Sequence, residues 1–274
     1  IPSGKSGVSE ASPLMWIDAL HLLFDRMKRQ KYPFADIRAI SVSGQQHGLV
    51  CLDKTGRLTR NSSKLWNDTS TTEECQLLTE GLGGRQAMIE EIGNTQRPGY
   101  TASKIYHLYR HEPEIAQKTD TFFLVHNYLN WFLTGGIRVM EPGDVPGMAL
   151  SFPGSDHWSE KVCGVISNDL INKLPPVKPS DQMIGKISGK LVEQYGFTAE
   201  CLIDAGSGDN MYGAIGTGNI EPGIVTISLG TSGTIYTVLE EPFVDPSGEI
   251  ASFCDSTGKY MPLLCVSNMA NGYN

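Results

Sequence analysis

Two kinds of hydrophobic pattern divide this sequence, and their order along the chain restricts the fold more than any other feature. Through residues 12–215, segments with apolar residues at three- and four-residue steps alternate with short β-rich segments. Residues 224–266 carry strand patterns only, around the turns GTSG (230–233) and DSTG (255–258). Alternating helices and strands are typical of an α/β domain, whereas successive hairpins build an antiparallel sheet. We therefore expect a domain boundary near residues 216–223.

Local signals place the elements of the first part. Ser12-Pro13 predicts a capped helix that continues to Met27, and the segment STTE at 70–73 predicts a capping box that opens a second helix. A third helix should run over residues 101–111 and end before Pro113. The remaining expected elements are strands at 37–42, 49–52 (in a hairpin around DKTG, 53–56), 122–125 and 201–205, a helix capped by Asn127 that stops at Gly135, and a helix at 189–195.

Two segments rich in proline and glycine interrupt this alternation. Residues 139–150 predict a surface loop, and residues 174–180, with three prolines, predict a second irregular crossing. Neither has the composition of an interdomain linker. We therefore expect both to connect elements within the first part.

The composition disfavours several classes of function. The net charge is -8, from 22 basic and 30 acidic residues, and no basic stripe occurs, so a nucleic-acid partner is not indicated. The six cysteines are scattered without a C-x-x-C pair, which indicates neither a zinc site nor a disulfide framework. No apolar run approaches the roughly 18 residues of a spanning helix. We expect a cytoplasmic protein with a small-molecule partner and no membrane association.

Two glycine-rich segments could carry phosphoryl chemistry. The turn SLGTSG (228–233) can direct successive N–H groups and hydroxyls into one concavity that holds phosphate oxygens, although an ordinary hairpin turn has the same composition. The segment GSGDN (206–210) follows a strand and precedes a helix. Its Asp209 is placed to accept a proton from a substrate hydroxyl, or equally to cap the helix. Spacing alone does not choose between these alternatives.

Three polar segments could contact a ligand. The segment GQQHG (44–48) sets two amides and an imidazole between predicted strands, which favours recognition of sugar hydroxyls over a solvated loop. The segment WND (66–68) offers an aromatic face and a carboxylate, but a core tryptophan followed by a capping aspartate explains it as well. The segment HNY (126–128) gives only a weak indication of binding.

In this order, the motifs resemble the FGGY family of carbohydrate kinases, and most closely its members that act on D-xylulose. The matching segments are 12–16, 44–48, 66–68, 99–102, 208–210 and 228–233. The resemblance implies an actin-like, ribonuclease H-like α/β fold with residues 1–218 as the N-terminal domain and residues 219–274 as the start of a second. An upstream Asp-x-Gly-Thr phosphate motif and downstream adenosine-binding glycines of the family are absent, so we expect the chain to be truncated at both ends.

The resemblance also implies roles for individual residues. Asp209 would be the general base, Gln46, His47, Asp209 and Asn210 would bind the sugar, and Gly230, Thr231 and Ser232 would lie at the ATP phosphates. The implied reaction is phosphoryl transfer from Mg-ATP to D-xylulose, with ATP and Mg²⁺ as cofactors. Whether the protein forms a homodimer is left open.

Departures from the family pattern bear on the substrate. Gln46-His47 stands where glycerol kinases carry Arg-Glu, which disfavours glycerol. Thr69 and Asn127 depart from residues common in bacterial ketose kinases, so sugars other than D-xylulose stay among the alternatives. The alternatives are a kinase of the family for another sugar, polyol or sugar acid, such as ribulose or gluconate, and a non-catalytic sugar-binding relative.

Overall fold

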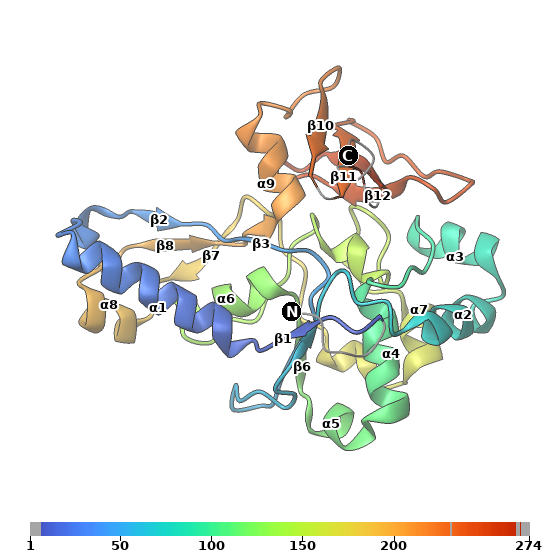
Figure 1. Cartoon of the computed structure of the whole chain (residues 1–274), viewed down its shortest axis with the longest axis horizontal. Coiled ribbons are helices and arrows are strands. Elements are labelled where there is room, and N and C mark those ends of the chain that lie inside the picture. The colour runs from blue at the N-terminus through green and yellow to red at the C-terminus, as the bar shows by residue number, and fades with distance from the viewer. Residues whose placement is uncertain (1–6, 231, 267–268, 270–274) are drawn as a thin grey trace.

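A computed structural model describes residues 7–230, 232–266 and 269 (Figure 1). Helices and short strands alternate through the first three quarters of the chain, and strands alone follow. The helices are α1 (Leu14–Arg29), α2 (Thr72–Gly81), α3 (Arg85–Ile92), α4 (Thr101–His111), α5 (Pro113–Lys118), α6 (Val125–Thr134), α7 (Glu160–Ile166), α8 (Gly189–Tyr195) and α9 (Asp209–Gly216), with 3-10 turns at Phe34–Asp36, Val145–Met148 and Leu170–Lys173. The strands are β1 (Glu10–Ala11), β2 (Ala39–Ile40), β3 (Ser43–Gly44), β4 (Val50–Leu52), β5 (Ser63–Lys64), β6 (Thr121–Phe123), β7 (Met183–Lys186), β8 (Leu202–Asp204), β9 (Ser207–Gly208), β10 (Val225–Leu229), β11 (Gly233–Thr237), β12 (Ala251–Cys254) and β13 (Tyr260–Val266).

Parallel pairing of distant strands brings two motif-bearing segments together. β2 pairs with β8, and directly beyond them β3 pairs with β9 in the register Ser43↔Ser207 and Gly44↔Gly208. The chain leaves both short strands at the same edge because the pairing is parallel. Residues after Gly44 and residues after Gly208 therefore start side by side, at the carboxyl ends of strands where α/β proteins bind ligands.

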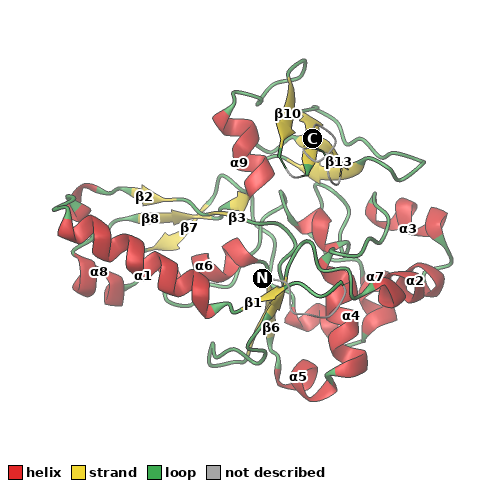
Figure 2. Cartoon of the chain, in the orientation of Figure 1, coloured by secondary structure: helices red, strands yellow, loops and turns green. Residues whose placement is uncertain are grey.

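Two large hydrophobic clusters hold this arrangement. Helices α1, α6 and α8 pack around β2, β8 and β7 through an aromatic group that contains Phe24, Phe34, Tyr195 and Phe197 (Figure 2). The second cluster lies among α2, α4 and α7. The helices predicted at 12–27, 101–111 and 189–195 are thereby confirmed, because each has an apolar face that one of these clusters buries.

The prediction of a surface loop at residues 139–150 is wrong. Met140, Met148, Ala149 and Leu150 are fully buried in the second cluster, and a bridge between Met140 and Val177 joins the two proline-rich segments. Proline and glycine give this segment an irregular path, but the path runs through the interior. Its polar residues are therefore buried and need partners, as the site described below shows.

Some predicted caps are also wrong, although their helices form. Ser70 does not cap α2; its hydroxyl donates to the Asp68 carboxylate, and α2 begins at Thr72. Asn127 lies inside α6, which begins at Val125 and ends at Thr134, and Gly135 follows in the left-handed conformation. The turn predicted around residues 53–56 does form, with the Asp53 N–H donating to the Arg57 carbonyl, but its hairpin consists of one bridge between Leu52 and Leu58. The longer partner of β4 is β6.

The last sheet confirms the two predicted hairpins. Its strand order is β10-β11-β13-β12, all antiparallel, and it stands at the top of the molecule in Figure 1, next to α9. Met211 and Ala214 of α9 pack with Tyr236, Phe253 and other residues of this sheet in a cluster of their own.

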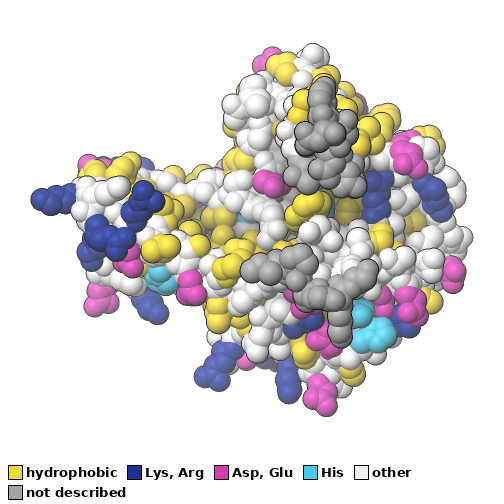
Figure 3. All heavy atoms as spheres, viewed as in Figure 1, with side chains coloured by type: hydrophobic (Ala, Val, Ile, Leu, Met, Phe, Trp, Pro, Cys, Tyr) yellow, Lys and Arg dark blue, Asp and Glu magenta, His cyan; other side chains and the backbone are white. Residues whose placement is uncertain are grey.

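Charge is distributed without a dominant basic face in the view of Figure 3. Basic side chains gather at the tip that carries the end of α1, where Arg26, Lys28 and Arg29 occupy the last turn, and acidic and basic groups are mixed elsewhere. Among the described residues, no helix is both long enough and apolar enough to cross a membrane.

Candidate active site

The predicted sugar-binding residues come together in one group. The Gln46 side chain follows β3, and its Oε1 accepts a hydrogen bond of 2.7 Å from the Asn210 side chain on α9. Its Nε2 donates to Oδ1 of the buried Asp144 at 3.0 Å. One planar amide thus links the two predicted segments to a carboxylate from the 139–150 segment. The parallel β3–β9 pair positions both segments, which explains why residues 164 positions apart meet here.

His47 has an unusual backbone conformation that three neighbours hold in place. Its φ is 64°, in the left-handed region that side chains other than glycine seldom adopt. Its N–H donates to Asp144 Oδ2 at 3.2 Å, while its carbonyl accepts from Lys104 Nζ at 2.6 Å and Thr101 Oγ1 at 3.2 Å. The backbone is therefore fixed on both sides.

The imidazole of His47 sits between two aromatic rings. Its centroid lies 4.8 Å from that of Tyr100 and 6.0 Å from that of Phe253, the second in a stacked arrangement. Nδ1 lies 3.3 Å from Asp144 Oδ1 but makes no hydrogen bond among the described residues. Gly147 touches the ring, and a Cβ there would collide with the imidazole. The ring orientation is thus set by packing.

Glu141 connects the site to the rest of the fold. Its fully buried carboxylate accepts hydrogen bonds from the N–H groups of Gly143 (2.7 Å) and Asp144 (3.0 Å), and from the hydroxyls of Ser180 (2.7 Å) and Ser207 (3.0 Å). His126 Nε2 lies 3.1 Å from the same carboxylate. Glu141 therefore fixes both Asp144 and the strand that precedes Asp209.

Asp209 occupies the first turn of α9, where its carboxylate faces the site. Its Oδ1 accepts the Asn210 N–H at 3.0 Å. Burial raises the pKa of Asp209 above its usual value, the negative charge of Asp144 raises it further, and His47 acts in the opposite direction. A Cβ at Gly208 would lie 2.9 Å from Gln46 Cγ, so glycine permits the close approach of these two segments. The arrangement suits a carboxylate that exchanges a proton with a bound hydroxyl.

The predicted phosphate turn adjoins this group through one contact. Thr234 of β11 donates from its hydroxyl to Asn210 Oδ1 at 3.2 Å. Within the turn, the Gly230 N–H donates to the Ser232 carbonyl at 3.1 Å. Thr231 lies outside the described residues. The other predicted phosphate-binding residues, Gly230 and Ser232, thus lie on a hairpin whose second strand contacts Asn210, one of the predicted sugar-binding residues.

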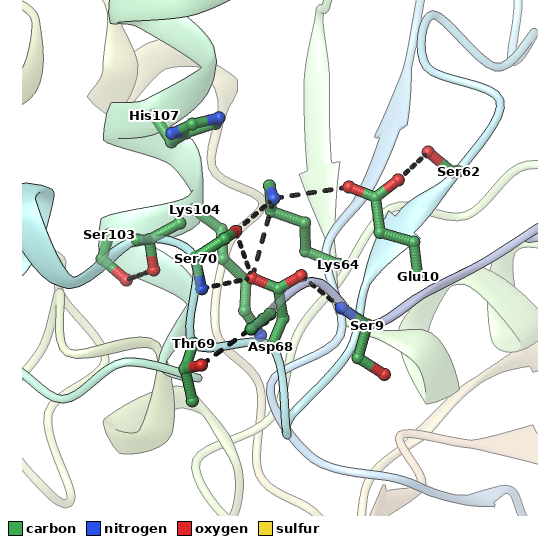
Figure 4. Close-up of polar contacts among 12 residues, drawn as sticks. Ser9, Glu10, Ser62, Lys64, Asp68, Thr69, Ser70, Ser103, Lys104 and His107 are labelled. Carbon is green, nitrogen blue, oxygen red and sulfur yellow. Dashed lines mark hydrogen bonds and ion pairs between the residues drawn. The ribbon is translucent and has the colours of Figure 1, made fainter. Parts of the chain in front are cut away.

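The other two polar segments have structural surroundings. Trp66 is 45% exposed and not in the core, while the buried Asp68 accepts from the N–H groups of Ser9 (2.8 Å) and Ser70 (3.0 Å) and lies 3.6 Å from Lys64 Nζ. Figure 4 shows this carboxylate joining the chain near β1 to the start of α2. The segment 126–128 is buried on α6. Within the described part of the chain, its polar contact to the site region is that of His126 with Glu141.

Four residues of this site were not predicted as site residues from the sequence, although the first of them lies in the family-matching segment 99–102: Thr101, Lys104, Glu141 and Asp144. Lys104 is fully buried, and burial lowers the pKa of Lys104 to about 7 against the opposing influence of Asp68 and Asp144. A signal for the acidic pair was present, because Glu141 and Asp144 are the charged residues of an otherwise apolar, proline-rich segment. Nothing local marked Lys104 as buried.

Comparison with known proteins places this site in a family. The sequence profile described as the FGGY family of carbohydrate kinases, N-terminal domain, matches residues 1–216. The chain therefore belongs to the FGGY family of carbohydrate kinases, and the predicted α/β fold of the actin-like ATPases is confirmed.

The relatives that the chain resembles are mainly xylulose kinases. The chain is 37% identical to the "Xylulose kinase" of Haemophilus influenzae, over 97% of this chain and 55% of that protein, and 34% identical to the "Xylulose kinase" of Streptomyces coelicolor, over 94% and 52%. Among solved structures, a "xyloylose kinase" from Brucella ovis superposes with a TM-score of 0.90 at 26% identity, over 98% of this chain and 55% of that one. The chain spans about half the length of the curated relatives it matches.

Proposed function

We propose that this chain forms the sugar-binding part of an enzyme that phosphorylates D-xylulose to D-xylulose 5-phosphate with ATP. The observation that carries the proposal is the joining of Gln46 and Asn210 in one hydrogen-bonded group with Asp144, beside Asp209. Relatives named xylulose kinase support the choice of sugar. Residues 1–218 as one domain and 219–274 as the start of another remain part of this proposal.

The polar group matches the needs of a ketose. A sugar buries several hydroxyls, each of which loses free energy unless it finds a partner. Gln46, His47 and Asn210 offer amide and imidazole groups that can donate or accept, and each is oriented by other residues of the chain. Such pre-oriented groups bind a hydroxylated ligand without first losing side-chain freedom.

Asp209 is the proposed general base. It would accept the proton of the terminal sugar hydroxyl as that oxygen attacks the γ-phosphorus of ATP, so that the proton ends on the carboxylate and ADP leaves. The raised pKa of Asp209 makes its carboxylate a stronger proton acceptor than an aspartate with the usual pKa. Asp144 contributes to this property by its charge and by holding Gln46 and His47.

The phosphates of ATP would lie at the turn of residues 228–233. We assign Gly230, Thr231 and Ser232 to them, because glycine and hydroxyl residues allow N–H and O–H groups to converge on phosphate oxygens. Mg²⁺ would enter with ATP and be held mainly by phosphate oxygens and water, and would neutralise charge on the phosphates. The carboxylates of the site that could add a ligand are Asp209 and Asp144.

An ATP-coupled assay with a sugar panel tests the proposal. The complete gene product would be given D-xylulose, L-xylulose, D-ribulose, L-ribulose, gluconate and glycerol with Mg-ATP. We expect kcat/KM to be highest for D-xylulose. Preference for ribulose or gluconate would move the enzyme to another substrate of the same family. Binding of a sugar without turnover on any member of the panel would support a non-catalytic sugar-binding protein instead.

A further inference from the structure

A second group of ionisable side chains lies away from the candidate active site, between α2 and α4. Glu74 of α2 has a side chain that is 2% exposed, and it faces His107 and His111, which are one turn apart on α4. Its Oε1 lies 3.4 Å from His107 Nδ1 and 3.1 Å from His111 Nε2. The two imidazole centroids are 4.5 Å apart. Three groups that can ligate a metal thus converge on one point.

The separations match a tetrahedral coordination sphere. With zinc–nitrogen and zinc–oxygen bonds of about 2.0–2.2 Å, two ligand atoms of a tetrahedron lie roughly 3.3–3.5 Å apart. The distances from Glu74 Oε1 to the two histidine nitrogens lie close to this edge, and all three ligand atoms are within 4.8 Å of one another. Small side-chain rotations would bring the three ligand atoms to the edges of a tetrahedron.

One of these nitrogens is also unsatisfied. His107 Nδ1 is buried and makes no hydrogen bond among the described residues, although Glu74 Oε1 is near. A buried imidazole nitrogen without a hydrogen-bond partner destabilises the folded state. A cation between this nitrogen and the carboxylate would give the nitrogen a partner, whereas Glu74 Oε1 already accepts a hydrogen bond from Arg110.

The neighbouring charges are compatible with a bound cation. Arg110 Nη1 donates to Glu74 Oε1 at 2.7 Å, and its Nη2 donates to Glu73 at 2.7 Å. A carboxylate oxygen can ligate a metal and still accept a hydrogen bond, and such outer contacts are usual around metal-binding carboxylates. Lys64 lies near His107 in Figure 4, but its charge is already paired with Glu10 and Asp68.

We propose that Glu74, His107 and His111 form a binding site for a borderline transition-metal ion such as Zn²⁺. Two histidines and a glutamate are a known zinc ligand set, and they leave a fourth position for water. His111, 45% exposed, gives the ion a path from solvent. Nitrogen ligands select such an ion over Mg²⁺ or Ca²⁺, which prefer oxygen.

Binding would fasten α2 to α4. The first two turns of α4 carry Thr101 and Lys104, whose side chains hold the carbonyl of His47 in the candidate active site. The metal would therefore stabilise a helix on which that site depends, from the helix's opposite end. It would act as a structural ion without contact to the sugar.

The site is tested by calorimetric titration of the metal-free chain with Zn²⁺, together with thermal unfolding with and without the ion. We expect one saturable ion per chain and a higher melting temperature with zinc, because a ligand that binds the folded state stabilises it. Co²⁺ in place of Zn²⁺ should give the visible absorption of a tetrahedral site. The change His111→Ala should weaken zinc affinity by about 10-fold or more and reduce the thermal shift at a given zinc concentration.

Control variants separate this site from other zinc ligands. His157→Ala removes an exposed histidine elsewhere, and Cys265→Ser removes the exposed thiol; both should retain the tight ion. His107→Gln should lose it, with circular dichroism as the check on folding. Absence of saturable binding, or tight binding that persists in His111→Ala, would overturn the proposal. In that outcome Glu74 is simply a buried carboxylate neutralised by Arg110.

Discussion

The two glycine-rich segments assigned to the active site differ in how the chain supports them. In the segment 206–210, residues 206–208 are buried, and there β9 pairs with β3 and the Ser207 hydroxyl donates to the Glu141 carboxylate. The turn at 228–233 projects from β10, whose Leu229 is 68% exposed. The described residues hold this turn mainly through its own backbone and through Thr234 of the strand that follows.

This difference in support indicates how strongly mutations in each segment should affect ligand binding. The proposed sugar-binding groups have fixed orientations because buried carboxylates and a buried lysine hold them. The phosphate turn has few such supports among the described residues. We therefore expect mutations of the proposed sugar-binding residues to have large effects on sugar binding or turnover. Mutations in the turn at 228–233 should have small effects, limited to the KM for ATP.

The largest effect should come from Asp209→Asn in the complete gene product. Loss of a general base typically lowers turnover by about 10² to 10⁴ fold, and kcat should fall much more than sugar affinity. Steady-state kinetics with D-xylulose and circular dichroism would measure this. A variant with near-normal kcat would leave Asp209 as a helix cap only.

The pH dependence of kcat/KM should carry the same signature. A base must be ionised to accept a proton, so activity should be lost as pH falls through the pKa of Asp209. Because burial and Asp144 raise this pKa, the acidic limb should lie above the 3.8 of an ordinary aspartate. An Asp144→Asn variant removes one of the two causes, so its limb should move to lower pH. An unmoved limb would show that Asp144 does not act on Asp209.

The change His47→Ala should have the next largest effect. A lost hydrogen bond to the sugar costs about 1 to 3 kcal/mol, or roughly 5- to 150-fold in the KM for D-xylulose, with little change for ATP. Alanine also lacks the ring that packs between Tyr100 and Phe253. Equal increases in both Michaelis constants would indicate that His47 supports the fold alone.

Lys104→Met should weaken sugar binding about tenfold, since the His47 carbonyl would lose its 2.6 Å partner and keep only Thr101.

The same change should alter how the stability of the fold depends on pH. The pKa of Lys104 is about 7 in the folded chain and near 10.5 when exposed, so between these values the unfolded chain binds more protons and stability rises with pH. Urea unfolding at several pH values should show a smaller rise in Lys104→Met. An identical rise would mean that Lys104 is not the titrating group.

The smallest effect should come from Ser232→Ala. A neutral hydroxyl hydrogen bond contributes about 0.5–1.5 kcal/mol, so the KM for ATP should rise less than about tenfold while the KM for D-xylulose stays constant. Product formation at varied ATP would measure it. A dominant effect on the sugar would break the division between the two segments.

Local patterns predicted the parts of the fold that depend on local sequence. The helix at 101–111 was found because Pro113 limits it, and the hairpins at 224–266 because their turns are short and glycine-rich. The segment 139–150 was misassigned because proline and glycine indicate an irregular path but not its depth. Its burial depends on packing against helices that precede it and follow it in the sequence.

The candidate site could be predicted only in part, for the same reason. Gln46, His47, Asp209 and Asn210 stand in dense polar motifs, and the structure brings Gln46 and Asn210 into contact and sets His47 against the same Asp144. Lys104 and Glu141 act through distant partners: Lys104 bonds a carbonyl 57 residues away, and Glu141 a hydroxyl 66 residues away. A single sequence does not reveal such pairings.

The central claim is that this chain by itself assembles the sugar-binding half of the site. Calorimetric titration of D-xylulose into the folded chain of 274 residues tests it most directly. We predict saturable binding of one sugar per chain, which His47→Ala weakens and Ser232→Ala leaves unchanged. A folded chain that shows no heat of binding with D-xylulose, or equal binding in the His47→Ala variant, would contradict the account.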